Sequence, residues 1–148
     1  MEKLLVHRKV KKADTGVDFD TFFCYRQVER KEEDGSVTWV DDINPATGKS
    51  IPVKVKLADS FKKKHPIADI KFPVYMVVDM KARMEVTTAA GKVEEVNTCY
   101  ITVDKDKDGK ARLDKYGKRH PLCVIHDVVE MSEAPRREIS WNDVADFE

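Results

Sequence analysis

Aromatic rings and lysines recur on the polar faces of several predicted β-strands. Three segments alternate an apolar row with a second row, and this second row holds Phe23, Tyr25, Tyr75 and Tyr100. In the segment 51–57, Lys54 and Lys56 take the equivalent positions. Aromatic rings stack on nucleic-acid bases at about 1–3 kcal/mol per base, and lysines attract phosphates. These residue types at this spacing predict a surface that binds a single strand with little sequence preference.

Two further features extend this prediction. Trp39 follows a hairpin signal, and it is either a core residue or part of the aromatic surface. The run "FKKKH" is the densest basic cluster, and we expect phosphate contacts from Lys62, Lys63 and Lys64. A purely structural interpretation stays open for all of these residues. Tyrosine is common on solvated strand faces, and a lysine run is common on the solvated side of a helix.

The elements that must position these residues are mostly strands. The segment 51–57 alternates apolar and charged positions with a period of two, which is typical of a half-buried strand. The segment 58–70 breaks this alternation and predicts one short helix that ends before Pro66. Turn signals that join strands as hairpins occur at 34–35, 44–49, 87–92 and 104–110.

This order of elements predicts a small barrel. A short chain must protect the edges of its sheet, and closing the strands into a barrel does so. A single helix in the middle of the strand order suits an oligonucleotide-binding (OB) barrel. We therefore predict a mostly β fold, with a five- to six-stranded OB-like barrel over residues 1–131. An acidic C-terminal tail or helix follows over residues 132–148. A β-sandwich of similar strand count is the alternative.

The composition fits a single domain. A chain of 148 residues with 41% hydrophobic residues is long enough for one core, and 36% charged residues predict a heavily solvated surface. No apolar run approaches the roughly 20 residues that span a bilayer, and the first residues lack the pattern of a secretory signal. Cys24, Cys99 and Cys123 lie in apolar stretches, which predicts buried reduced thiols and a cytoplasmic location.

Motifs for catalysis and for cofactor binding are missing from the sequence. It contains no nucleophile elbow, Walker loop or dinucleotide-binding glycine pattern. The run "HPLCVIH" (120–126) suggests a metal site, but its side chains diverge on a strand and on a helix alike. They therefore cannot all reach the distances of about 2.0–2.3 Å that zinc requires. We expect a protein that is not an enzyme and that holds no metal or cofactor.

The chain ends in an acidic segment that contains aromatic rings. Within 132–148, five acidic residues outnumber two arginines, so this segment has a net charge of −3 and the other 131 residues have +3. The residues of interest are Trp141, Asp143, Asp146 and Phe147. One interpretation is a free tip that binds a partner protein. The other is a docked helix that begins at Ser140, with acidic residues near its positive end.

The barrel, the tyrosines beside lysines and the acidic tip together resemble single-stranded DNA-binding proteins of the OB type. In that family an acidic tip with a phenylalanine recruits replication and repair proteins, and the matching residues in "NDVADFE" are Asp143, Asp146 and Phe147. The segments "IPVKVKLADSF" and "FPVYMVVDM" are also similar to the middle of small helix-destabilising proteins of phages. The resemblance implies a role in replication or recombination and an origin in a phage or mobile element.

We therefore expect a protein that binds single-stranded DNA and not membranes, with Trp141 and its acidic neighbours as a contact for replication or recombination proteins. Small OB modules often form homodimers, which would extend the binding groove. The alternative is a structural or protein-interaction β-domain, such as a sandwich subunit of a virion. In that case the tyrosines pack against another chain, and the protein has no affinity for oligonucleotides.

Overall fold

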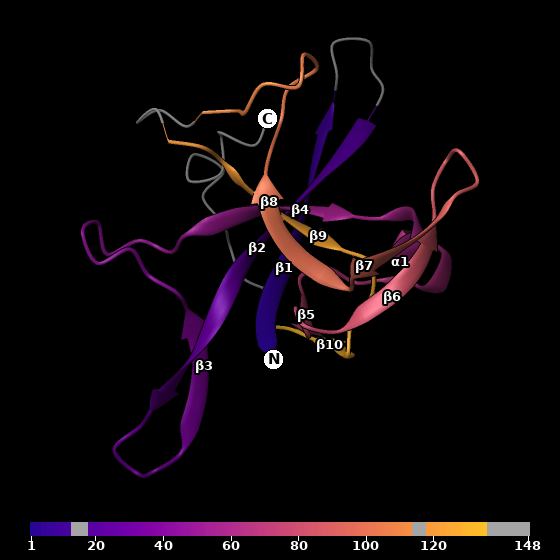
Figure 1. Cartoon of the computed structure of the whole chain (residues 1–148). Coiled ribbons are helices and arrows are strands. Elements are labelled where there is room, and N and C mark those ends of the chain that lie inside the picture. The colour runs from indigo at the N-terminus through magenta and orange to yellow at the C-terminus, as the bar shows by residue number, and fades with distance from the viewer. Residues whose placement is uncertain (13–17, 114–117, 136–148) are drawn as a thin grey trace.

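The computed structural model describes the backbone of residues 1–12, 18–113 and 118–135 (Figure 1). Within these ranges the chain is mostly β, with one α-helix and one turn of 3-10 helix. The helix is α1 (Asp59–Lys64), and the 3-10 turn is Ile67–Asp69. The strands are β1 (Glu2–Lys12), β2 (Asp18–Lys31), β3 (Val37–Asp41), β4 (Pro52–Leu57), β5 (Val74–Val78), β6 (Arg83–Thr87), β7 (Val93–Asn97), β8 (Cys99–Val103), β9 (Pro121–Ile125) and β10 (Glu130–Glu133).

The strands form one large curled sheet and one separate ribbon. The order in the sheet is β10-β5-β1-β2-β4-β9-β8, and β3 pairs with the far end of β2. The pairs are antiparallel except for β4 and β9, which are parallel. Strands β6 and β7 pair only with each other among the described strands and form a ribbon. The curled sheet resembles half of a barrel (Figure 1), as expected for a small β-barrel.

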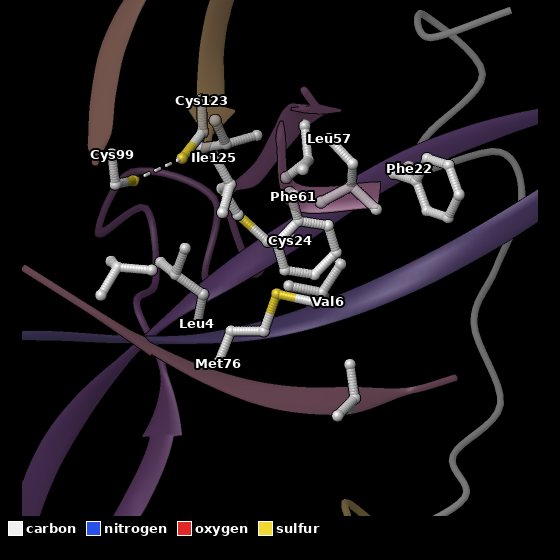
Figure 2. Packing of buried hydrophobic residues seen from close by; sticks show 14 residues of the cluster. Leu4, Val6, Phe22, Cys24, Leu57, Phe61, Met76, Cys99, Cys123 and Ile125 are labelled. Atoms are coloured by element: carbon white, nitrogen blue, oxygen red, sulfur yellow. Dashed lines mark hydrogen bonds between the residues drawn. The ribbon is translucent and has the colours of Figure 1, made fainter. Parts of the chain in front are cut away.

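The core lies on the face of this sheet that α1 covers, because Phe61 of α1 belongs to the core cluster. In β4, Val53, Val55 and Leu57 are buried while the side chains between them are less buried, so the predicted alternation is confirmed. The helix begins after Ala58 and ends before Pro66, as predicted. Phe61 of α1 is completely buried and packs into the core between strands (Figure 2). Burial of this ring therefore fixes the helix against the sheet.

The three cysteines lie in the core as free thiols, as predicted. The sulfur atoms of Cys99 and Cys123 are 3.5 Å apart (Figure 2). The pKa of the Cys99 thiol is raised, first by its hydrogen bond with Cys123 and then by burial. The pKa of Cys123 is also raised, mainly by a hydrogen bond with Cys24. The thiols of Cys99 and Cys123 are therefore protonated, and they act as small apolar groups in the core.

Two boundaries differ from the prediction. The segment 71–86, expected to be one long bent strand, divides into β5 and β6 around a turn in which the Lys81 amide donates to Asp79. The predicted strand over 93–103 also divides, into β7 and β8, and β1 and β10 were not predicted, so the strand count is higher than the expected five or six. The predicted domain boundary between residues 131 and 132 falls inside β10, because Ser132 and Glu133 still pair with β5. Within the described ranges, no helix has the length and apolar character needed to cross a membrane.

Candidate nucleic-acid interface

The sheet brings the predicted aromatic residues and lysines onto the face opposite the core. Tyr75 of β5 and Tyr25 of β2 both pair with Leu5 of β1. In the adjacent row, Phe23 pairs with Lys54. Val124 of β9 lies between Lys56 of β4 and Tyr100 of β8. Side chains of directly paired residues project from the same face of a sheet, so the register places all six predicted residues on one face.

The centre of this face is buried, and the expectation that Phe23 and Tyr25 are open to stacking bases is wrong. Phe23 is 0% exposed and Tyr25 is 4% exposed. The His7 ring stacks on Phe23 at a centroid distance of 5.2 Å, and both rings meet Tyr25 edge-on. Leu5 is buried beside them. These side chains form a second apolar layer, so the sheet is covered on both faces at its centre.

A cleft lies beside this buried strip, between the sheet, α1 and the tip of the β6–β7 ribbon. Its volume is about 740 Å³. Figure 1 shows the ribbon beside α1, and residues 85–89 of the ribbon line the cleft opposite the helix. Four of the predicted phosphate ligands line it together: Lys54, Lys56, Lys62 and Lys63. Lys54 and Lys56 project from β4 and the other two from α1, so the fold joins two basic segments that are separate in the sequence.

The charges of the cleft are only partly balanced. The Lys54 ammonium donates to the buried carboxylate of Asp104 at 3.1 Å, and Arg112 lies 3.4 Å from the same carboxylate. By contrast, Lys56, Lys62 and Lys63 are exposed and form no ion pair with any residue in the described ranges. The other carboxylates of the lining are Asp59 and Glu85. Within the described part of the chain, three ammonium groups therefore remain available to an anionic ligand.

His126 lies in the wall of the cleft and connects it with Tyr100. Its Nδ1 atom is 3.0 Å from the Ser60 hydroxyl, and its ring is 5.9 Å from that of Tyr100. Burial lowers the pKa of His126, and the positive charge of Lys56 lowers it further. A neutral imidazole and a partly buried phenol thus border the lysines. Tyr100 does not itself line the cleft, but it contacts His126, which does.

The remaining predicted residues lie elsewhere. Lys64 forms an ion pair with Asp127 at 2.9 Å and does not line the cleft. Trp39 and Tyr75 border a second hollow of about 500 Å³, on the far side of the buried strip. Trp39 is 40% exposed, so of the two expectations for this residue the exposed surface position is the observed one. The tail residues Trp141, Asp143, Asp146 and Phe147 lie outside the described residues.

Three residues of the two hollows were not predicted from the sequence. Lys3 lies over the rings of Trp39 and Tyr75. The sequence could have indicated its position, because Lys3 and Leu5 are two residues apart in β1 and therefore share a face. His126 was considered only as a metal ligand, and its contact with Ser60 across 66 positions has no local signal. Glu85 reaches the cleft because the β6–β7 ribbon folds beside α1, which no pattern in the ribbon itself indicates.

The described residues contain no group of three or more His, Cys, Asp or Glu side chains that could hold a metal ion. A comparison of the chain with protein-family models, with curated proteins and with solved structures found no match. The geometry and charge of the two hollows are therefore the features that bear on function.

Proposed function

We propose that the protein binds single-stranded DNA with little sequence preference and thereby supports replication or recombination, without catalysing a reaction. The observation that carries this proposal is the cleft in which β4 and α1 present four lysines, three of them without an ion-pair partner in the described ranges. Closely spaced ammonium groups are a site for phosphates, and displacement of condensed counterions favours binding of a polyanion.

The shape of the site favours a single strand. A volume of about 740 Å³ lies within the range of sites that enclose a small ligand, roughly 300–1,000 Å³. A few nucleotides of a flexible strand can enter such a cleft, and the rest of the strand can continue outside it. Tyr100 and His126 offer ring surfaces near the lysines, and stacking on rings requires bases that are not already stacked in a duplex.

The test is a fluorescence anisotropy titration of labelled oligo-dT, repeated at several salt concentrations. For a single strand, the slope of log affinity against log salt changes by about 0.7 for each phosphate contact. The double variant K62Q/K63Q should therefore bind more weakly and reduce this slope by about 1.4. The measurement distinguishes specific phosphate contacts from a general effect of net charge when a matched control is included.

The matched control is K107Q/K110Q, which removes the same charge from an exposed turn that does not line the cleft. We expect this control to keep a slope close to that of the wild type. Salt-independent binding, or equal losses in the two double variants, would show that the cleft is not the phosphate site. Absence of any binding at low ionic strength would refute the proposed function itself.

A second candidate function is that of a protein-interaction domain, and one observation favours it. The ribbon formed by β2 and β3 extends away from the body of the sheet (Figure 1). Large apolar side chains on this ribbon and the loop after it are 39% to 49% exposed: Val28, Val37, Trp39, Ile43 and Ile51. Val37 and Trp39 share one face of the ribbon, and exposed apolar groups that lie together are typical of contact surfaces. Size-exclusion chromatography separates the candidates, because this one predicts an elution volume that added oligo-dT does not change.

A further inference from the structure

The second hollow contains a lysine held by two aromatic rings. The Lys3 ammonium lies 4.5 Å from the centroid of the Tyr75 ring and 5.0 Å from that of the Trp39 ring. Both ring faces are therefore directed at the same point. Three strands create this arrangement, since Lys3 belongs to β1, Trp39 to β3 and Tyr75 to β5. Segments from distant parts of the chain thus converge on one cation.

The hollow around these rings is open and has polar groups in its wall. Its volume is about 500 Å³, which is larger than one lysine side chain requires. Gln27 and Asp41 line it, and the Gln27 amide donates to the Asp41 carboxylate at 2.8 Å. Ser50 donates to the other oxygen of the same carboxylate at 2.7 Å. This network fixes the wall, whereas Lys3 is a long side chain that can leave the rings by rotation about its own bonds.

We propose that Trp39 and Tyr75 form a clamp for one nucleobase of the bound strand, and that Lys3 fills this clamp when no strand is present. This inference rests on the proposed binding of single-stranded DNA. When a base enters, it stacks on the rings that Lys3 covered, and the released ammonium moves to a neighbouring phosphate. A contact between a cation and exposed rings is weaker than stacking of a base on the same rings, so the exchange favours the bound state.

The clamp and the lysine cleft hold different parts of the strand. From β5 to β4 there are three strand spacings, which is about 14 Å at ~4.8 Å each. The buried strip of Leu5, Phe23 and Tyr25 lies between them. A strand that occupies both sites is held at two points, and the clamp adds base stacking to the phosphate contacts of the cleft. Because every base has a π face, the clamp accepts any sequence.

Tryptophan fluorescence tests the clamp directly, because the chain has two tryptophans and only Trp39 borders the hollow among the described residues. Oligo-dT should quench the wild-type emission, and the midpoint of quenching should equal that of the anisotropy titration. The quenching should be largely absent in W39F. An oligonucleotide of the same length with abasic sites should still bind the lysine cleft but should leave the Trp39 emission unchanged.

Substitution of the other two residues provides matched variants. Y75L removes the ring and should weaken binding about tenfold, whereas Y75F keeps the ring and should bind like the wild type. K3Q should retain the quenching and reduce the salt slope by about 0.7, because one phosphate contact is lost. The affinities of Y75L and Y75F report on the clamp without depending on the emission of Trp39.

The outcomes separate the clamp from the proposed function. Anisotropy that shows binding, without quenching by oligo-dT and with equal affinities of Y75L and Y75F, would overturn the clamp and leave DNA binding in place. Equal quenching by oligo-dT and by the abasic strand would also overturn it, since the base would then play no part. If no strand binds at all, the proposed function fails and the clamp fails with it.

Discussion

At the scale of single residues, exposure decides which aromatic rings can take part in binding. Phe23 and Tyr25 share a sheet face with Tyr75 and Tyr100, but only the first two are fully enclosed. An enclosed ring contributes to stability and not to binding, because it would have to leave its packed position in order to stack on a base. The residues that can contact a strand are therefore the rings at the two ends of the face and the lysines beside them.

His126 provides a prediction on pH dependence at this scale. Burial and the charge of Lys56 lower its pKa below 6.5. A phosphate near Lys56 would offset that charge and raise the pKa of His126 in the complex. The bound state would then take up a proton that the free state does not, so affinity should increase as the pH falls into the range between the free and bound pKa values. NMR titration of His126 with and without oligo-dT measures both values.

The stability of the free protein also depends on the protonation of His126. It decreases as the pH falls, whereas the affinity for the strand increases. Because the pKa of His126 is lower in the folded protein, the unfolded chain takes up the proton first as the pH falls below about 6.5. Its contribution to stability is therefore present above that pH and is lost on acidification. In H126N, both this loss and the increase in affinity at low pH should diminish. An unchanged pKa of His126 at saturating oligo-dT would contradict its location beside bound phosphate.

At the scale of elements, α1 is a short helix that tertiary packing holds in place. A helix of six residues is too short to be stable alone. Phe61 is completely buried while Lys62 and Lys63 are exposed on the same helix. The buried ring therefore determines where the two lysines project, and core packing on one side of α1 positions the charges on the other side.

Phe61→Ala tests this dependence. Truncation of a buried phenylalanine should reduce the free energy of unfolding by about 3–5 kcal/mol, which denaturant titration measures. Lys62→Ala on the same helix is the control, and as an exposed substitution it should change stability by no more than about 0.5 kcal/mol. Similar losses in the two variants would contradict the anchoring role of Phe61.

The elements also show how far the sequence predicts the site. The alternation in 51–57 correctly predicted the exposure pattern of β4, and Pro66 correctly marked the limit of α1. The alternation along this strand predicts Phe23 and Tyr25 on an open face, although a strand with consecutive apolar residues, as in 22–25, is typical of a sheet covered on both faces. The cleft itself depends on the β6–β7 ribbon, which lies beside α1 although β5 separates the two segments in the sequence. Local patterns do not encode such contacts.

At the scale of the whole molecule, the net charge is zero, and binding of a polyanion must come from the distribution of charge. The described fold supports such a distribution, because it collects lysines of β4 and α1 at one cleft and places Lys3 at a second hollow. Lys54 and Lys56 project from the face opposite the core, whereas α1 packs against the core through Phe61, so the cleft joins lysines from both sides of β4.

Mapping of backbone amide shifts by NMR shows whether a single strand occupies the lysine cleft. Oligo-dT added to the ¹⁵N-labelled protein at low salt should shift the amides of residues 54–63 and 85–89 and of His126. The amides of the exposed turn 106–110 should stay unchanged. Saturation binding that leaves the residues of the cleft unshifted, or a spectrum that does not change at all, would contradict the account.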